Sequence, residues 1–102
     1  MAAILFVRLK SELAFEELER RMEDRRPQFL EVPGLVQKFY GRDKATGAVC
    51  GIYLFETRAA LDAFRETELA KTIPSAYEAT EVRPEVYDLL TSLRPERGPL
   101  AE

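Results

Sequence analysis

The sequence predicts one α+β domain of ferredoxin-like βαββαβ order, with a four-stranded antiparallel sheet and its helices on one face. Two observations indicate this fold. Strand-like and helix-like segments follow one another in that order along a chain of 102 residues, a length that fits one domain. The first and third strand segments are also apolar on both faces, which is typical of a sheet covered on both sides.

The first half supplies a strand, a helix and a second strand. Residues 4–9 are nearly all apolar, and Ser11 is a candidate N-cap for the helix that follows. Pro27 is expected to kink that helix or to restart it at Gln28, and Val32-Pro33-Gly34 to end it. Residues 35–42 then form the second predicted strand.

The second half repeats the pattern after a polar hairpin loop. Residues 48–55 read as the third strand, Thr57 as a helix cap, and residues 67–73 as a short helical piece. Residues 80–89 form the fourth strand. Because Pro84 cannot donate to a strand ladder, we expect this strand at a sheet edge. The predicted domain spans residues 1–89, and residues 90–102 form a tail or dimer arm.

The apolar third strand predicts an uncovered surface. We expect Phe6, Val49, Tyr53 and Phe55 on the sheet face away from the helices, with Cys50, Ile52 and Leu54 beneath the helices. Soluble monomers avoid an exposed apolar patch of this kind. A symmetric homodimer, with two sheets face to face around an apolar pocket, would cover it.

Composition excludes several classes of function. A formal net charge of -3 argues against nucleic acids and anionic membranes as partners. With one cysteine and no histidine, neither an internal disulfide, a histidine-based triad nor an ordinary zinc or haem site is expected. We therefore expect no cofactor and a cytoplasmic location. The absence of Asn and the excess of Arg over Lys are typical of a heat-adapted host.

Several motifs resemble a known family. They are Val32-Pro33-Gly34-Leu35, then Lys38-Phe39-Tyr40, and then Gly51-Ile52-Tyr53-Leu54-Phe55 followed by the helix near Arg58-Ala59-Ala60-Leu61. This chain resembles the YdhR-like monooxygenases of the dimeric α+β barrel superfamily, which also contains the antibiotic-biosynthesis monooxygenases. The resemblance implies a homodimer and insertion of oxygen into a small aromatic or polyketide-like substrate without metal, flavin or haem.

A cofactor-free oxygenase must bind its substrate as a phenolate or enolate, which requires cations or donors in a dry site, and a base. The catalytic candidates are Arg8, Lys38, Tyr40 and Tyr53, all expected on the helix-free face. The expected substrate pocket is formed by Ile4, Phe6, Val36, Val49 and Phe55.

Each candidate also has a structural interpretation. Arg8 can reach solvent from a strand end, Lys38 and Tyr40 can form the wet face of an edge strand, and Tyr53 can pack in the core. Cys50 is expected to be an inert small residue, and Arg83, Glu85 and Tyr87 to make intersubunit contacts. A non-catalytic ligand-binding or sensor dimer, and a plain dimerisation module, remain alternatives to an enzyme.

Overall fold

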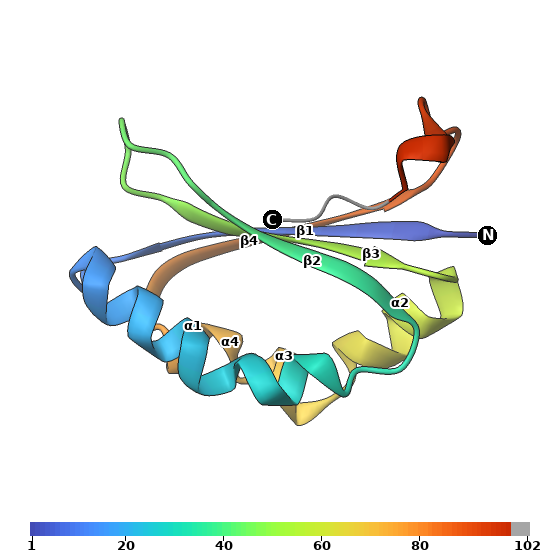
Figure 1. Ribbon diagram of the computed structural model, residues 1–102. Helices are drawn as coiled ribbons and strands as arrows, with labels where there is room; N and C mark the ends of the chain where they lie inside the picture. The colour runs from blue at the N-terminus through green and yellow to red at the C-terminus, as the bar shows by residue number, and fades with distance from the viewer. Residues whose placement is uncertain (99–102) are drawn as a thin grey trace.

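The computed structural model describes residues 1–98, and these form the predicted α+β sandwich of one sheet and one helical layer (Figure 1). The sheet has the order β2-β3-β1-β4 with every neighbour antiparallel. Its strands are β1 (Ala3–Ser11), β2 (Leu35–Arg42), β3 (Val49–Phe55) and β4 (Ala79–Asp88). The helices are α1 (Phe15–Leu30), α2 (Arg58–Arg65), α3 (Glu68–Lys71) and α4 (Ile73–Ala76), with a 3-10 turn, η1, at Pro95–Arg97.

The helices all lie on one side of the sheet, and the other side carries no helix of the sandwich (Figure 1). We call this second side the helix-free face. Alternation along β1 buries Ala3, Leu5, Val7 and Leu9 beneath the helices. The core is completed by an aromatic group in which Phe64 lies 5.3 Å from Tyr53 and 5.6 Å from Phe55 between ring centres.

The strand register corrects the expected faces of β3. Leu5 lies opposite Tyr53, Ala3 opposite Phe55 and Leu9 opposite Val49, so these three β3 residues point toward the helices and are buried. Their expected place on the helix-free face was wrong. The same register puts Cys50, Ile52 and Leu54 on the helix-free face instead, in line with Arg8, Phe6 and Ile4. β3 is apolar at almost every position, so it has no alternation from which to assign the faces.

The helix boundaries agree with some of the predicted signals and not with others. Thr57 caps α2 and Thr67 caps α3, each by accepting a hydrogen bond from a backbone N–H three residues ahead. Helix α1 begins after Ala14, and Ser11 instead accepts a bond from the N–H of Leu13. α1 also continues through Pro27 without a second start, because only the N–H of residue 27 is lost.

Two turns fix how the elements join. Gly34, before β2, has φ of 76°, and a methyl group in place of its hydrogen would lie 2.6 Å from Cβ of Ala60. Helix α2 can therefore approach this turn closely only because residue 34 has no side chain. Gly47, in the hairpin loop between β2 and β3, has a similar φ of 77° but faces open space.

The two edge strands differ from the inner pair. Pro84 lies in β4 at one edge, as predicted. At the other edge the β2–β3 register shifts between Leu35 and Gln37, so Val36 falls at an irregularity and is 47% exposed. After β4 the chain passes to the side of the helix-free face, where η1 lies (Figure 1). Residues 99–102 of the expected tail lie outside the described residues.

Among the described residues, no helix is both long enough and apolar enough to cross a membrane.

Candidate functional site

The side chain of Lys38, a residue of β2, lies on the helix side of the sheet and extends toward α1. Its Cα partner in the ladder is Tyr53, a core residue, so the two side chains share a face. The ammonium nitrogen lies 3.4 Å from the ring centre of Phe29, 4.3 Å from that of Tyr40 and 4.5 Å from that of Tyr53. The expectation that Lys38, Tyr40 and Tyr53 lie on the helix-free face was therefore wrong, although the structure does bring the three together.

Glycine at position 51 makes room for this lysine. A methyl group at Gly51 would lie 3.3 Å from Cε of Lys38 and 3.1 Å from Cε1 of Tyr53, tighter than ordinary van der Waals contact. The lysine stem can therefore lie across β3 and direct its amine inward, toward Phe29 of α1. A larger side chain at position 51 would push the stem away from the aromatic rings.

Arg25 supplies a second cation from α1. It donates to the backbone oxygen of Leu69 at 2.7 Å, and its guanidinium carbon lies 5.7 Å from the ring centre of Phe29 and 5.6 Å from that of Tyr77. Its Nε and the Tyr77 hydroxyl are buried, and neither has a hydrogen-bond partner. Within residues 1–98, neither Lys38 nor Arg25 forms an ion pair with a carboxylate. We call this set the Lys38 cluster: Arg25, Phe29, Lys38, Tyr40, Tyr53 and Tyr77.

Burial sets the protonation of the cluster. Loss of water, with a smaller effect from the positive charge of Arg25, lowers the pKa of Lys38 to about 7. Loss of water around its hydroxyl raises the pKa of Tyr40 to about 12, although the residue stays 44% exposed, and burial raises the pKa of Tyr53 and of Tyr77. Near neutral pH the cluster therefore combines an amine that can gain or lose a proton with tyrosine hydroxyls that stay protonated and can donate hydrogen bonds.

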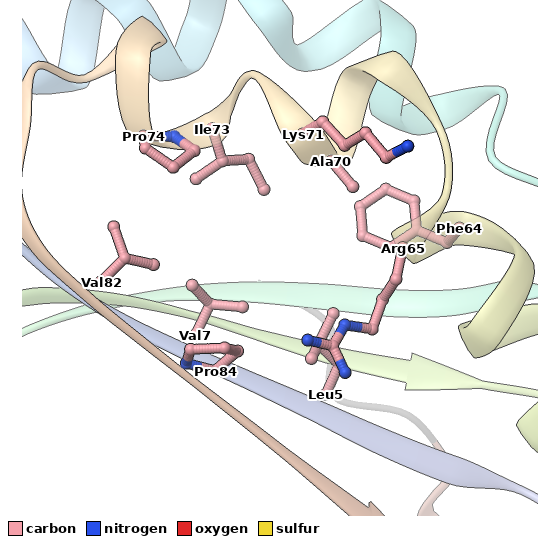
Figure 2. A pocket seen from close by; sticks show the side chains of 10 residues that line it. All are labelled: Leu5, Val7, Phe64, Arg65, Ala70, Lys71, Ile73, Pro74, Val82 and Pro84. Atoms are coloured by element: carbon pink, nitrogen blue, oxygen red, sulfur yellow. The ribbon is translucent and has the colours of Figure 1, made fainter.

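Two cavities adjoin on the helix side of the sheet. The smaller, about 20 Å³, is bordered by Lys38, Tyr40, Tyr53 and Tyr77 of the cluster. The larger, about 190 Å³, lies beneath α3 and α4 (Figure 2). Its lining is mainly apolar, with Arg65 and Lys71 as its two charged side chains. Val7 and Ile73 border both cavities, so these two side chains form the wall between them.

The remaining predicted site residues do not join the cluster. Ile4, Phe6 and Arg8 lie on the helix-free face, on the opposite side of the sheet from Lys38. Val49 borders the smaller cavity, Phe55 is fully buried in the core and Val36 is exposed. The single chain has cavities on the helix side, and the pocket expected between the helix-free faces of two copies stays a prediction.

Sequence reasoning missed three members of the cluster. Phe29, Tyr77 and Arg25 were not among the predicted site residues, and Arg25 lies in a run of charged residues that is typical of a solvated helix face. Arg20, Arg21 and Arg26 do pair with α1 carboxylates, and Arg25 alone of the four lacks one among the described residues. The helical spacing of Arg25 and Phe29, four residues apart, was the signal that could have placed them on one face.

A match to a family model shows to which protein family this chain belongs. Residues 4–95 match the model described as "Putative mono-oxygenase ydhR". This chain belongs to the ydhR family. The match covers the helical layer and, apart from Ala3, all four strands of the ydhR-family chain, including every member of the Lys38 cluster. A search among curated proteins gives no match.

Solved structures share the fold of this ydhR-family chain at low sequence identity. SnoaB from Streptomyces nogalater, described as a cofactor-independent oxygenase, superposes with a TM-score of 0.75 at 14% identity, covering 91% of this chain and 97% of SnoaB. A "putative antibiotic biosynthesis monooxygenase" from Deinococcus radiodurans gives 0.72 at 9% identity, covering 92% and 97%. One from Caulobacter crescentus, of the same description, gives 0.71 at 20%, covering 88% and 91%.

Proposed function

We propose that this protein is a cofactor-independent monooxygenase that binds a small aromatic or polyketide-like substrate as an anion beside Lys38. The observation that carries the proposal is the Lys38 amine. It is directed into an aromatic enclosure next to a second cation, Arg25, and no carboxylate within residues 1–98 pairs with either. Such a site lacks the negative charge that a phenolate or enolate would supply. The family description and the SnoaB fold support the same activity.

The chemistry assigns a base and a set of donors. The neutral amine of Lys38 takes the proton from a substrate hydroxyl, and the ammonium so formed stays beside the anion it has created. The tyrosine hydroxyls remain protonated and can donate to the anion. The electron-rich anion then reduces dioxygen. In the overall step a CH₂ group becomes C=O, one oxygen atom stays on that carbon, and the other leaves as water with the two hydrogens.

The larger cavity offers room for the apolar part of a substrate. In Figure 2 its walls are the apolar side chains of Leu5 and Val7 from the sheet and of Ala70 and Ile73 from the helices. A ring system placed there would need Ile73 to move before its hydroxyl could reach Lys38, because Ile73 separates the two cavities.

Oxygen consumption with a dihydroxyanthracene-type substrate tests the proposal. Lys38→Met should fold but lose about 10²- to 10³-fold in turnover, the usual effect of removing one preorganised charged group. Lys44→Met, in the exposed hairpin loop, is the matched control and should keep wild-type turnover. Arg8→Ala tests the helix-free face. Full loss in Arg8→Ala with wild-type turnover in Lys38→Met would place the reaction on that face and overturn the proposal.

One feature favours a non-catalytic ligand-binding protein as the second candidate. The larger cavity is lined mainly by apolar groups, and its only charged side chains are two cations, so by itself it could hold an apolar anion without reacting with it. Tight binding of such compounds without any oxygen consumption, across a panel of phenols and quinols, would favour this alternative.

We propose that the functional unit is a homodimer formed through the helix-free face. In register across β2, β3 and β1, this face presents Phe39, Ile52 and Phe6, and then Leu54 beside Ile4. The register turns these apolar side chains away from the buried face, to the side of the sheet that no α-helix covers (Figure 1). A second copy would remove them from water, which is the main favourable contribution to association. Arg83, Glu85 and Tyr87 on neighbouring β4 then lie where intersubunit contacts are expected.

A further inference from the structure

The Lys38 amine has the surroundings of a nucleophile as well as those of a base. An exposed lysine is protonated and hydrated, and a buried lysine is usually paired with a carboxylate. Lys38 has neither arrangement. Its amine lies among three ring faces, borders a cavity, and has no ion pair or hydrogen bond within the described part of the chain.

A second polar group in the same cavity has no well-formed hydrogen bond. The Tyr77 hydroxyl is buried, its residue being only 4% exposed, and within residues 1–98 the Arg25 side chain interacts with it without reaching hydrogen-bond geometry. Tyr77 and Lys38 both border the smaller cavity. A buried hydroxyl without a partner costs free energy, about 1–3 kcal/mol, so a ligand oxygen that bonds to it is favoured.

We propose that Lys38 condenses reversibly with small aldehydes and ketones to form an imine in this cavity. The amine nitrogen attacks the carbonyl carbon and forms a carbinolamine. The carbonyl oxygen then leaves as water with the two protons that the amine loses, and a C=N bond remains. No electrons are transferred, so the reaction requires neither dioxygen nor any cofactor. It is therefore independent of the proposed oxygenase activity.

The charged and titratable groups around the amine favour its nucleophilic form. Arg25 from α1 is the nearest cation and opposes a second positive charge, whereas Tyr40, Tyr53 and Tyr77 are all neutral. Burial acts in the same direction as Arg25 and contributes more. The ring faces oppose both, because they attract an ammonium by about 0.5–2 kcal/mol. With its pKa lowered to about 7, Lys38 is neutral at pH 7 far more often than an ordinary lysine.

The size of the cavity limits the ligand. A free volume of about 20 Å³ accommodates one water-sized group, such as the carbonyl carbon that becomes bonded to the amine nitrogen. The rest of a larger molecule would have to occupy the neighbouring larger cavity. Small aliphatic carbonyl compounds are accordingly the class that needs the least rearrangement at this site.

Reductive trapping with acetaldehyde and sodium cyanoborohydride tests the inference on the native protein. Cyanoborohydride reduces the imine to an N-ethyl amine, and peptide mass spectrometry then measures the yield at each of the four lysines, residues 10, 38, 44 and 71. Reagent is limited to less than one ethyl group per chain on average. At pH 7 we expect Lys38 to be modified at least ~10-fold more than Lys44, and this preference to shrink toward parity by pH 10.

Two controls test whether the preferential modification depends on the folded enclosure and on Lys38 itself. In concentrated guanidinium the preference for Lys38 should fall to within about twofold of the other lysines, because the enclosure is lost. Lys38→Arg, which keeps the charge but cannot form an imine, should lower the summed native-state modification of the lysines at pH 7 by more than half. A Lys38 that is modified no faster than Lys44 in the native protein at pH 7 would overturn the inference, whether or not the protein consumes oxygen.

Discussion

The ammonium nitrogen of Lys38 lies 3.4 Å from the ring centre of Phe29. Through this contact the edge strand β2, which carries Lys38, meets the last turn of α1, which carries Phe29. The contact has two opposing effects. The ring attracts a positive charge, while the burial that the helix imposes disfavours it. The balance lowers the pKa of Lys38 to about 7, and this has a measurable effect on stability.

Lys38→Met should change stability in a pH-dependent manner. An unfolded lysine has a pKa of about 10.4, so between pH 7 and pH 10.4 the unfolded wild-type chain binds more protons at this group than the folded chain. The group's contribution to the free energy of unfolding therefore rises with pH across this window, by up to about 1.4 kcal/mol per pH unit, and its destabilising effect is complete below pH 7. The stability of Lys38→Met relative to wild type should fall as pH rises from 7 to 10. Urea unfolding of both proteins measures this difference, and Lys44→Met should show none. A flat difference for Lys38→Met would contradict a lowered pKa.

Ile73→Ala should join the two cavities. Truncating this buried wall residue should cost about 2–4 kcal/mol of stability, yet tighten the binding of a three-ring dihydroxyanthracene relative to a one-ring phenol. Leu61→Ala is the matched control, because Leu61 is fully buried and borders neither cavity. It should lose similar stability without any gain in ligand affinity. Thermal unfolding and fluorescence titration measure the two effects, and equal ligand affinities in both variants would count against a shared wall.

Gly34→Ala and Gly47→Ala should differ although the two glycines share nearly the same backbone conformation. Each alanine must adopt a positive φ, which costs about 1 kcal/mol. Only at Gly34 does the new methyl group also meet Cβ of Ala60, at 2.6 Å. We expect Gly47→Ala to lose about 1 kcal/mol and Gly34→Ala to lose at least 2 kcal/mol more, in chemical denaturation. Equal losses would mean that α2 shifts away at little cost.

Ile52→Asp should separate the proposed dimer. The change puts a carboxylate in the middle of the helix-free face, between Phe6 and Phe39, where burial without a partner is costly. Light scattering coupled to gel filtration should give twice the chain mass of 11.7 kDa for wild type and the single mass for the variant. Leu30→Asp changes an apolar residue of α1 that is 74% exposed and should remain dimeric. A monomeric wild type at micromolar concentration would contradict the assembly.

The order of elements could be predicted because each boundary has a local cause. Thr57 caps α2 by its own hydroxyl, and Pro84 lacks the N–H that an inner strand needs. The faces of β3 could not be predicted, since Val49 through Phe55 offers apolar residues to both sides. Because the β2–β3 register puts Lys38 and Tyr40 on the same face as Tyr53, assigning the wrong face to β3 also assigned the wrong face to Lys38 and Tyr40. The enclosure around Lys38 depends further on Arg25 and Phe29, which are close to it only after α1 packs on the sheet.

Pro84 and the irregularity at Val36 have a consequence for how copies of this chain can associate. An edge strand with a full row of free N–H and C=O groups can recruit another strand, and repeated recruitment builds fibrils. Here one edge lacks a donor at Pro84, and the other is interrupted where the β2 register shifts. Neither edge offers a long, regular template. Association through the sheet face, by contrast, is complete after one pairing, because each copy has a single such face to cover. We therefore expect the protein not to form fibrils at high concentration, even though its strands are rich in β-branched and aromatic residues.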